Sequence, residues 1–194
     1  DLPVPSTDAC VKDEGGNMLP VGEVGEPCIK GPQVMKGYWN RPEDTAEVLR
    51  DGRLHTGDVG TMDEDGYTFI VDRIKDMILC SGFNVYPRNV EEAIYLHPAV
   101  DEAVVCGAPH SHPGEIVKAY VELKPGALLT SAELRAFLKD KLSPIEMPKQ
   151  VEFRDTPLPK TLIGKLSRKA VLEEEAAKAA AASGAAEAAA RTGT

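Results

Sequence analysis

Between residues 72 and 172, segments with a helical pattern alternate with segments that have a strand pattern, and this alternation constrains the fold most strongly. Helices are predicted within 87–98 and 130–142, where apolar residues recur at helical spacing. Strands are predicted at 100–109 and 115–124, the second with side chains alternating between two faces. Because this stretch has the length of a small domain, roughly 100 residues, we expect one compact α+β unit here.

Local signals mark the ends of both predicted helices. Pro87 stands at the first helical position, where a missing N–H costs nothing, and Pro98 follows the helix end. Thr130 and Glu133 have the spacing of a capping box, in which each side chain binds the other residue's backbone N–H.

Residues 1–71 have a different pattern, typical of β structure. Strand-like segments at 9–12, 26–30 and 67–71 are separated by the turn signals "DEGGN", "KGPQ" and "DEDG". A short helix is expected within 40–52. The chain also begins abruptly, as if inside an existing fold, so we expect it to be a fragment.

Charge and cysteine content exclude several classes of function. The net charge is -9, which argues against a nucleic-acid coat or a binder of anionic membranes, since both need positive surfaces. No apolar run approaches the length of a membrane span. The four cysteines are scattered, which predicts reduced thiols in a cytoplasmic protein.

The alanine-rich residues 173–194 offer no amphipathic face, so a frayed or disordered tail is expected.

The basic stretch "PLPKTLIGKLSRKAV", at 157–171, resembles a phosphate-binding loop but is no Walker motif. The required earlier glycine is missing, and Leu166 stands where Mg²⁺ would need Ser or Thr. When this motif is considered without its context, the commoner interpretation is a basic loop exposed to solvent. The alternative is that Gly164 allows close approach to a ligand while Lys165 brings a point charge to phosphate or carboxylate oxygens.

Three further motifs have equally ordinary interpretations when considered singly. Asp58, in "HTGD", follows a tight turn and could accept hydrogen bonds from a diol. The motif "VDRIKDMI" contains Asp72, Arg73 and Lys75, and its ordinary interpretation is a set of ion pairs at the surface. Gly82, in "CSGFNVYP", suggests a bent strand or bulge, or a place where a narrow ligand passes close to the backbone.

Neither a metal site nor a cysteine nucleophile is expected. His110 and His112 lack further ligands at suitable spacing, and Glu115 alone does not complete a site. Cys80 has no histidine near it in sequence.

The order of these motifs is more informative than any one of them. "GEVGEPCIKGPQVMKGYWNRPEDTAEVL", "GRLHTGD", "DEDGYTFIVDRIKDMILCSGFNVYPRNVEE" and "PLPKTLIGKLSRKAV" follow one another along the chain. Together they resemble the C-terminal part of the AMP-forming acyl-activating enzymes, and the "SGFNVYP" form is most like the long-chain fatty-acid–CoA ligases. The resemblance covers essentially 1–175.

This resemblance implies a two-step ligase reaction. A carboxylate, here a fatty acid, attacks ATP to give an acyl-adenylate and pyrophosphate, and coenzyme A then displaces AMP. The family's Mg²⁺ ligand and acyl pocket are expected upstream, so chain-length preference is not encoded here. The resemblance further implies a cytoplasmic enzyme, with peripheral membrane contact and homodimerisation left open.

Roles for individual residues follow from the matching positions. Asp58, Arg73 and Lys75 would bind the nucleotide, and Asp72 would be the hinge before a mobile lid. Lys165 would be the lysine of the adenylation step.

The same resemblance assigns a second half-reaction to another loop. Ser81 and Gly82 would line the channel for the pantetheine arm of coenzyme A. Asn89 departs from the family's usual glutamate, at a position that looks peripheral.

The expected organisation is therefore the β-rich end of a large adenylating domain at 1–71, a small α+β lid at 72–172, and the tail at 173–194. Alone, the fragment should be inactive. Two alternatives remain: a free-standing, non-catalytic lid or interaction module, and an adenylation domain that serves a carrier protein.

Overall fold

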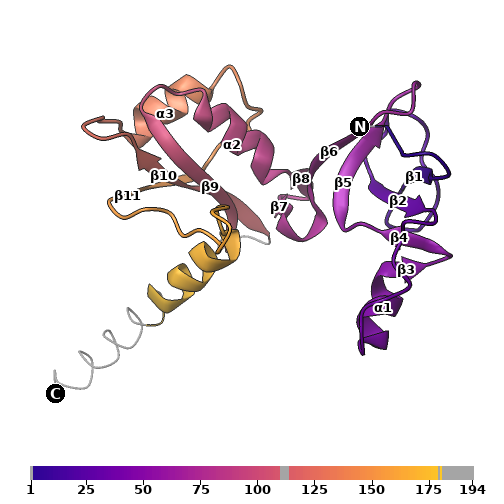
Figure 1. Ribbon diagram of the computed structural model, residues 1–194. Helices are drawn as coiled ribbons and strands as arrows, with labels where there is room; N and C mark the ends of the chain where they lie inside the picture. Colours follow the sequence, from indigo (N-terminus) through magenta and orange to yellow (C-terminus); the bar gives the residue numbers. More distant parts are fainter. Residues whose placement is uncertain (1, 110–113, 179, 181–194) are drawn as a thin grey trace. The chain divides into compact units, whose positions relative to one another are not determined.

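The computed structural model of the chain describes residues 2–109, 114–178 and 180 (Figure 1). The chain forms two compact units, Asp1–Met77 and Ile78–Thr194. Within the described residues, no helix combines the length and the apolar character needed to cross a membrane.

The division between the units falls later than the change of pattern at Asp72. Strand β6 (Thr68–Arg73) continues past that residue, and the 3-10 helix η1 (Ile74–Asp76) follows it directly. The first N–H of η1 donates to the carbonyl of Gly57 over 3.0 Å. This hydrogen bond holds the segment after Asp72 to the first unit.

The first unit contains a four-stranded antiparallel sheet in the order β1-β2-β4-β3 and a separate hairpin of β5 and β6. The predicted strands at 9–12, 26–30 and 67–71 and the short helix are confirmed, whereas β3, β4 and β5 were not predicted. The elements are β1 (Asp8–Lys12), β2 (Glu26–Lys30), α1 (Pro42–Val48), β3 (Leu49–Arg50), β4 (Arg53–His55) and β5 (Asp58–Met62).

The second unit is the predicted α+β unit, built on a three-stranded sheet in the order β11-β10-β9. Strand β10 pairs antiparallel with β9 and parallel with β11. A helical segment at 168–178 follows at the end. The elements are β7 (Ile78–Cys80), β8 (Phe83–Val85), α2 (Pro87–Tyr95), β9 (Val100–Pro109), β10 (Glu115–Leu123), α3 (Ser131–Leu138) and β11 (Gln150–Arg154).

The two faces of this sheet have separate cores, because neighbouring residues of a strand point to opposite sides. Val105 of β9 packs with Val90 and Ile94 of α2 and Leu134 of α3. The opposite face, which the 168–178 segment covers, has a smaller cluster: Val104, Cys106, Tyr120, Leu158 and Val171, with Leu166 packed against them. Figure 1 shows α2 and α3 on one side of the sheet and the yellow helix on the other.

The helix ends agree with the sequence signals. Pro87 stands at the start of α2. The capping box of α3 is complete, because the Thr130 side chain accepts from the Glu133 N–H while the Glu133 carboxylate accepts from the Thr130 N–H.

Ion pairs hold the terminal helical segment to the sheet. Nζ of Lys118, on β10, lies 2.7 Å from a Glu175 oxygen and 2.9 Å from Glu152 on β11. Arg154 binds Glu174 over 2.6 Å. Residues 173–178 were expected to begin a frayed or disordered tail, but they continue the helix. The reason is that the acidic side chains of Glu174 and Glu175 form ion pairs with Arg154 and Lys118 on the sheet.

Acid is expected to weaken this attachment. Burial alone raises the pKa of Glu175, but hydrogen bonds from Lys118 and Lys178 outweigh burial and lower that pKa to about 2. Because the folded-state pKa is depressed, the stabilisation is present above about 4.5 and is lost as the pH falls toward 2. We expect Glu175→Gln to cost about 1–2 kcal/mol of unfolding free energy at pH 7 and almost nothing at pH 2.

Urea unfolding of both proteins at several pH values measures this difference. Glu173→Gln is the matched control, since Glu173 lies 3.7 Å from Lys169 and both side chains are highly exposed. An equal cost of Glu175→Gln at pH 7 and pH 2 would contradict the assignment.

Candidate functional site

The first candidate group lies in the first unit, where Asp58 begins β5 and is paired in register with Arg73 at the end of β6. Oδ1 of Asp58 lies 3.4 Å from Nε of Arg73. The Arg73 side chain is 62% exposed and that of Asp58 is 28% exposed, so both can contact a molecule from solvent. Of the residues predicted to bind the nucleotide, the structure thus brings two together, while Lys75 lies exposed in η1.

Asp72, the predicted hinge, is buried within β6 opposite Val59. Its Oδ1 accepts the N–H of Arg73 over 2.8 Å. It lies inside the first unit rather than at the division after Met77. Its role as a hinge stays a prediction.

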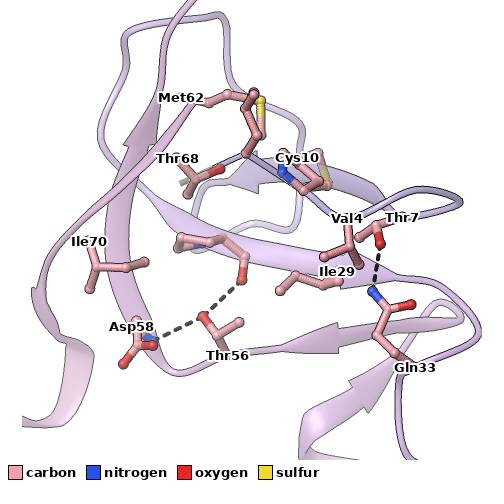
Figure 2. Close-up of a pocket in the computed structure, with 14 residues that line it drawn as sticks. Val4, Thr7, Cys10, Ile29, Gln33, Thr56, Asp58, Met62, Thr68 and Ile70 are labelled. Carbon is pink, nitrogen blue, oxygen red and sulfur yellow. Dashed lines mark hydrogen bonds between the residues drawn. The ribbon is translucent and has the colours of Figure 1, made fainter. Parts of the chain in front are cut away.

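Asp58 also borders a cavity of about 310 Å³ within the first unit (Figure 2). The remaining walls are largely apolar and include Ile29, Met62 and Ile70. A hollow with apolar walls and a carboxylate is suited to a ligand that combines an apolar part with hydrogen-bond donors such as hydroxyl groups.

Hydrogen bonds to β2 fix the turn that presents Asp58. The Thr56 hydroxyl donates to the carbonyl of Pro27 over 2.9 Å and accepts the Asp58 N–H over 3.2 Å (Figure 2). Gly57 has φ +72°, a backbone conformation that glycine adopts without strain, and its N–H donates to Oε1 of Glu26 over 2.9 Å.

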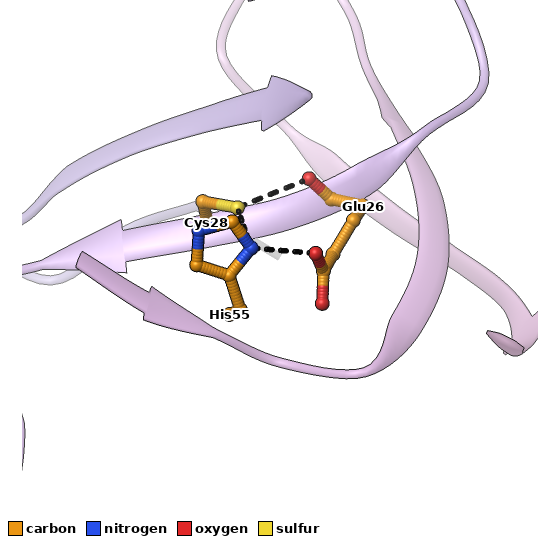
Figure 3. Close-up of side chains that lie close together, drawn as sticks. All are labelled: Glu26, Cys28 and His55. Atoms are coloured by element: carbon orange, nitrogen blue, oxygen red, sulfur yellow. Dashed lines mark hydrogen bonds and ion pairs between the residues drawn. The ribbon is translucent and has the colours of Figure 1, made fainter. Parts of the chain in front are cut away.

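The same glutamate binds a buried histidine, as Figure 3 shows. Oε2 of Glu26 lies 2.6 Å from Nδ1 of His55, and Sγ of Cys28 lies 3.4 Å from that nitrogen. Burial and the nearby Glu26 carboxylate raise the pKa of the Cys28 thiol to about 11. At neutral pH the thiol is therefore protonated and a poor nucleophile.

Glu26, Cys28 and His55 also have the composition of a metal site, with ligand atoms within 4.8 Å of one another. However, both Glu26 oxygens already accept hydrogen bonds, and the separation of 2.6 Å from His55 is that of a hydrogen bond. A cysteine and a histidine also do not suit Mg²⁺, which prefers oxygen ligands. We interpret the cluster as the support of the Asp58 turn.

Sequence reasoning missed this support. Pairing of β2 with β4 places Cys28 opposite His55, although the two residues are far apart in the chain. Only the strand assignment of β4, which is three residues long, could have revealed the contact.

The second candidate group lies in the second unit, where Ser81 and Gly82 connect β7 to β8. Their φ values are +52° and +84°, and Cys80 pairs with Phe83 across them. This geometry is that of a tight hairpin turn in which both central residues have positive φ, rather than a bent strand or a bulge. A β-carbon added at Gly82 would meet nothing within 4 Å, so this turn is open to solvent.

Lys165 lies on a second hairpin. The N–H of Thr161 donates to the carbonyl of Lys165 over 2.7 Å, and the N–H of Gly164 donates to the carbonyl of Thr161 over 2.8 Å. Gly164 has φ +78°. Among the described residues, no carboxylate lies within ion-pair distance of the Lys165 ammonium, which is exposed. This cation is therefore available to an incoming anion.

Two further residues from the sequence analysis, Glu115 and Cys80, lie in the described part of the second unit. His110 and His112 lie outside the described residues. The Glu115 carboxylate accepts the N–H of Leu79 over 3.1 Å, and Cys80 is buried.

Comparison with known families gives two matches. Residues 89–165 match the model of the AMP-binding enzyme C-terminal domain, and residues 1–39 match that of the AMP-binding enzyme.

Individual proteins are similar over most of this chain. This chain is 55% identical over 174 residues to a long-chain-fatty-acid–CoA ligase of Bacillus subtilis (strain 168). The match covers 89% of this chain and 31% of the relative. The chain is 48% identical over 165 residues to a feruloyl-CoA synthase of an Amycolatopsis species, covering 84% and 33%. The solved structure of ATP-bound MatB from Rhodopseudomonas palustris has a TM-score of 0.82 at 42% identity, covering 90% of this chain and 35% of that one. The chain thus spans about a third of the length of each of these three proteins.

Proposed function

This chain belongs to the AMP-binding enzymes, and from that premise we propose that it is the C-terminal third of an ATP-dependent acyl-CoA ligase. The resemblance predicted from the sequence motifs is confirmed by the family matches. In the proposed reaction a carboxylate oxygen attacks the α-phosphorus of ATP and pyrophosphate leaves. The thiolate of coenzyme A then attacks the acyl carbon, and AMP leaves.

The observation that carries the proposal is the contrast between Asp58 and Lys165. Asp58 lies on a turn that Glu26 and Thr56 fix by hydrogen bonds, as suits a carboxylate that accepts hydrogen bonds from ribose hydroxyls. Lys165 is exposed at a hairpin and lacks an ion-pair partner among the described residues. We propose that it approaches the substrate carboxylate and the α-phosphate, where its charge offsets their repulsion as negative charge builds up.

A fatty acid is the proposed substrate. The support is the 55% identity to the Bacillus subtilis ligase, against 48% to the feruloyl-CoA synthase.

Several finer features belong to the same proposal. Mg²⁺ would accompany ATP and be held by residues outside this chain, because the described cluster with metal-ligand composition does not suit it. The four free cysteines support a reducing, cytoplasmic location. Peripheral membrane contact and homodimerisation of the complete enzyme stay predictions.

A chimera tests the proposal. In this chimera, our chain replaces the 174-residue segment that it matches in the Bacillus subtilis ligase. We expect fatty-acid-dependent exchange of pyrophosphate into ATP at a rate within about tenfold of the parent enzyme. The parent with the segment deleted is the background control, and this chain alone should form no acyl-CoA. A folded chimera without exchange, or acyl-CoA formation by the chain alone, would overturn the proposal.

A further inference from the structure

The hairpin that carries Lys165 is held to the second unit at both of its ends. On the first arm, Nζ of Lys160 lies 2.7 Å from a carboxylate oxygen of Glu102, on β9. On the second arm, Leu166 packs against the apolar cluster on the sheet face described above. At the tip between them, Leu162 is fully exposed and Ile163 is 78% exposed. The pose of Lys165 therefore depends on contacts at the base of the hairpin.

Arg168, at the base of the hairpin, contacts both α2 and β9. Its Nη2 lies 2.6 Å from Oε2 of Glu91, on α2, and its Nε donates to the carbonyl of Val105, on β9, over 3.2 Å. Oε1 of Glu91 accepts the N–H of the same Val105 over 2.8 Å. The pair thus binds both backbone groups of one residue on β9 and joins α2, β9 and the start of the terminal helix.

This pair differs from an ordinary surface ion pair. The side chains of Arg168 and Glu91 are only 24% and 14% exposed. Hydrogen bonds between charged groups are short and strong when solvent is largely excluded. Arginine also fits the geometry better than lysine would, because its planar group donates to two acceptors in fixed directions.

We infer that the Glu91–Arg168 pair positions Lys165 for adenylate formation by holding the base of its hairpin against β9. Glu91 and Arg168 are positioning residues in this view, because neither would touch the substrate. The inference deepens the proposed function and rests on it for the role of Lys165, whereas the effect on the hairpin can be measured without any activity.

Hydrogen exchange of the 194-residue chain tests the structural part. Glu91→Gln places an amide next to Arg168 and removes the charge attraction. We expect exchange in residues 160–167 to accelerate at least about tenfold, while β10 exchanges as before. Glu92→Gln is the matched control on the same helix, since Glu92 forms an exposed ion pair with Arg88, with side chains 64% and 55% exposed. Unchanged exchange at 160–167, or equal acceleration throughout the unit, would overturn the inference.

The chimera tests the functional part. Glu91→Gln and Arg168→Lys should each lower the maximal rate of pyrophosphate exchange about tenfold or more, with less change in KM for ATP. Thioester formation from supplied acyl-adenylate should change less than about twofold. Equal loss in both half-reactions would show general damage and would contradict positioning. If the unmodified chimera lacks exchange while Glu91→Gln still loosens the hairpin, the proposed function fails and the structural part stands.

Discussion

Replacing Lys165 by alanine in the chimera is expected to lower pyrophosphate exchange at least about a hundredfold. The reason is electrostatic: the substrate carboxylate and the α-phosphate are both negative, and their approach then lacks the cation that offsets repulsion. Thioester formation from supplied acyl-adenylate should proceed within about twofold of the unmodified rate, because in the proposed mechanism the lysine takes part only in the first step.

Lys169→Ala is the matched control for this experiment. Lys169 is a highly exposed lysine of the same basic stretch, 3.7 Å from the exposed Glu173, so both half-reactions should remain unchanged. If Lys165→Ala slows the two half-reactions equally, Lys165 does not have the specific role that we propose.

Replacing Gly82 by tryptophan is expected to have the opposite selectivity. We expect thioester formation to fall about a hundredfold, because a large side chain at the turn would obstruct the pantetheine arm. Pyrophosphate exchange should stay within about threefold. Both rates can be measured on one preparation of the chimera.

Backbone strain must be separated from obstruction in this test. Gly82 has φ +84°, so any side chain adds strain whatever the space around it. Gly82→Asn is the control, since asparagine tolerates positive φ better than other residues and is much smaller than tryptophan. If the asparagine and tryptophan variants lose thioester formation equally, the loss comes from the backbone, and the channel assignment is contradicted.

Helices α2 and α3 and strands β9 and β10 of the second unit could be predicted because they are long and have clear ends. Strands β9 and β10 alternate over 10 and 9 residues, and α3 begins with a complete capping box. In contrast, β3, β4, β7 and β8 are two or three residues long. Segments this short show no periodicity, so the sequence pattern suggests a bent strand or bulge at Gly82 instead of the hairpin turn formed by Ser81 and Gly82.

The candidate site was predictable only where its residues occur in motifs. Asp58 and Lys165 could be found from "HTGD" and "IGKL". Glu26, which supports the Asp58 turn, comes from a strand far upstream. Glu91, which binds Arg168, lies on helix α2, and α2 precedes all three strands of the sheet in the sequence. Such contacts depend on strand register and on packing between elements, which no local pattern specifies.

The contacts around Val105 have a consequence for association between molecules. Strand β9 is at an edge of its sheet, and unpaired backbone groups at an edge invite a strand from another chain. Glu91 and Arg168 occupy both outward backbone groups of Val105, and the Tyr95 hydroxyl hydrogen-bonds with both backbone groups of Ala103. A foreign strand must displace these side chains before it can add to β9, so we expect Glu91 and Arg168 to protect this edge against aggregation as well.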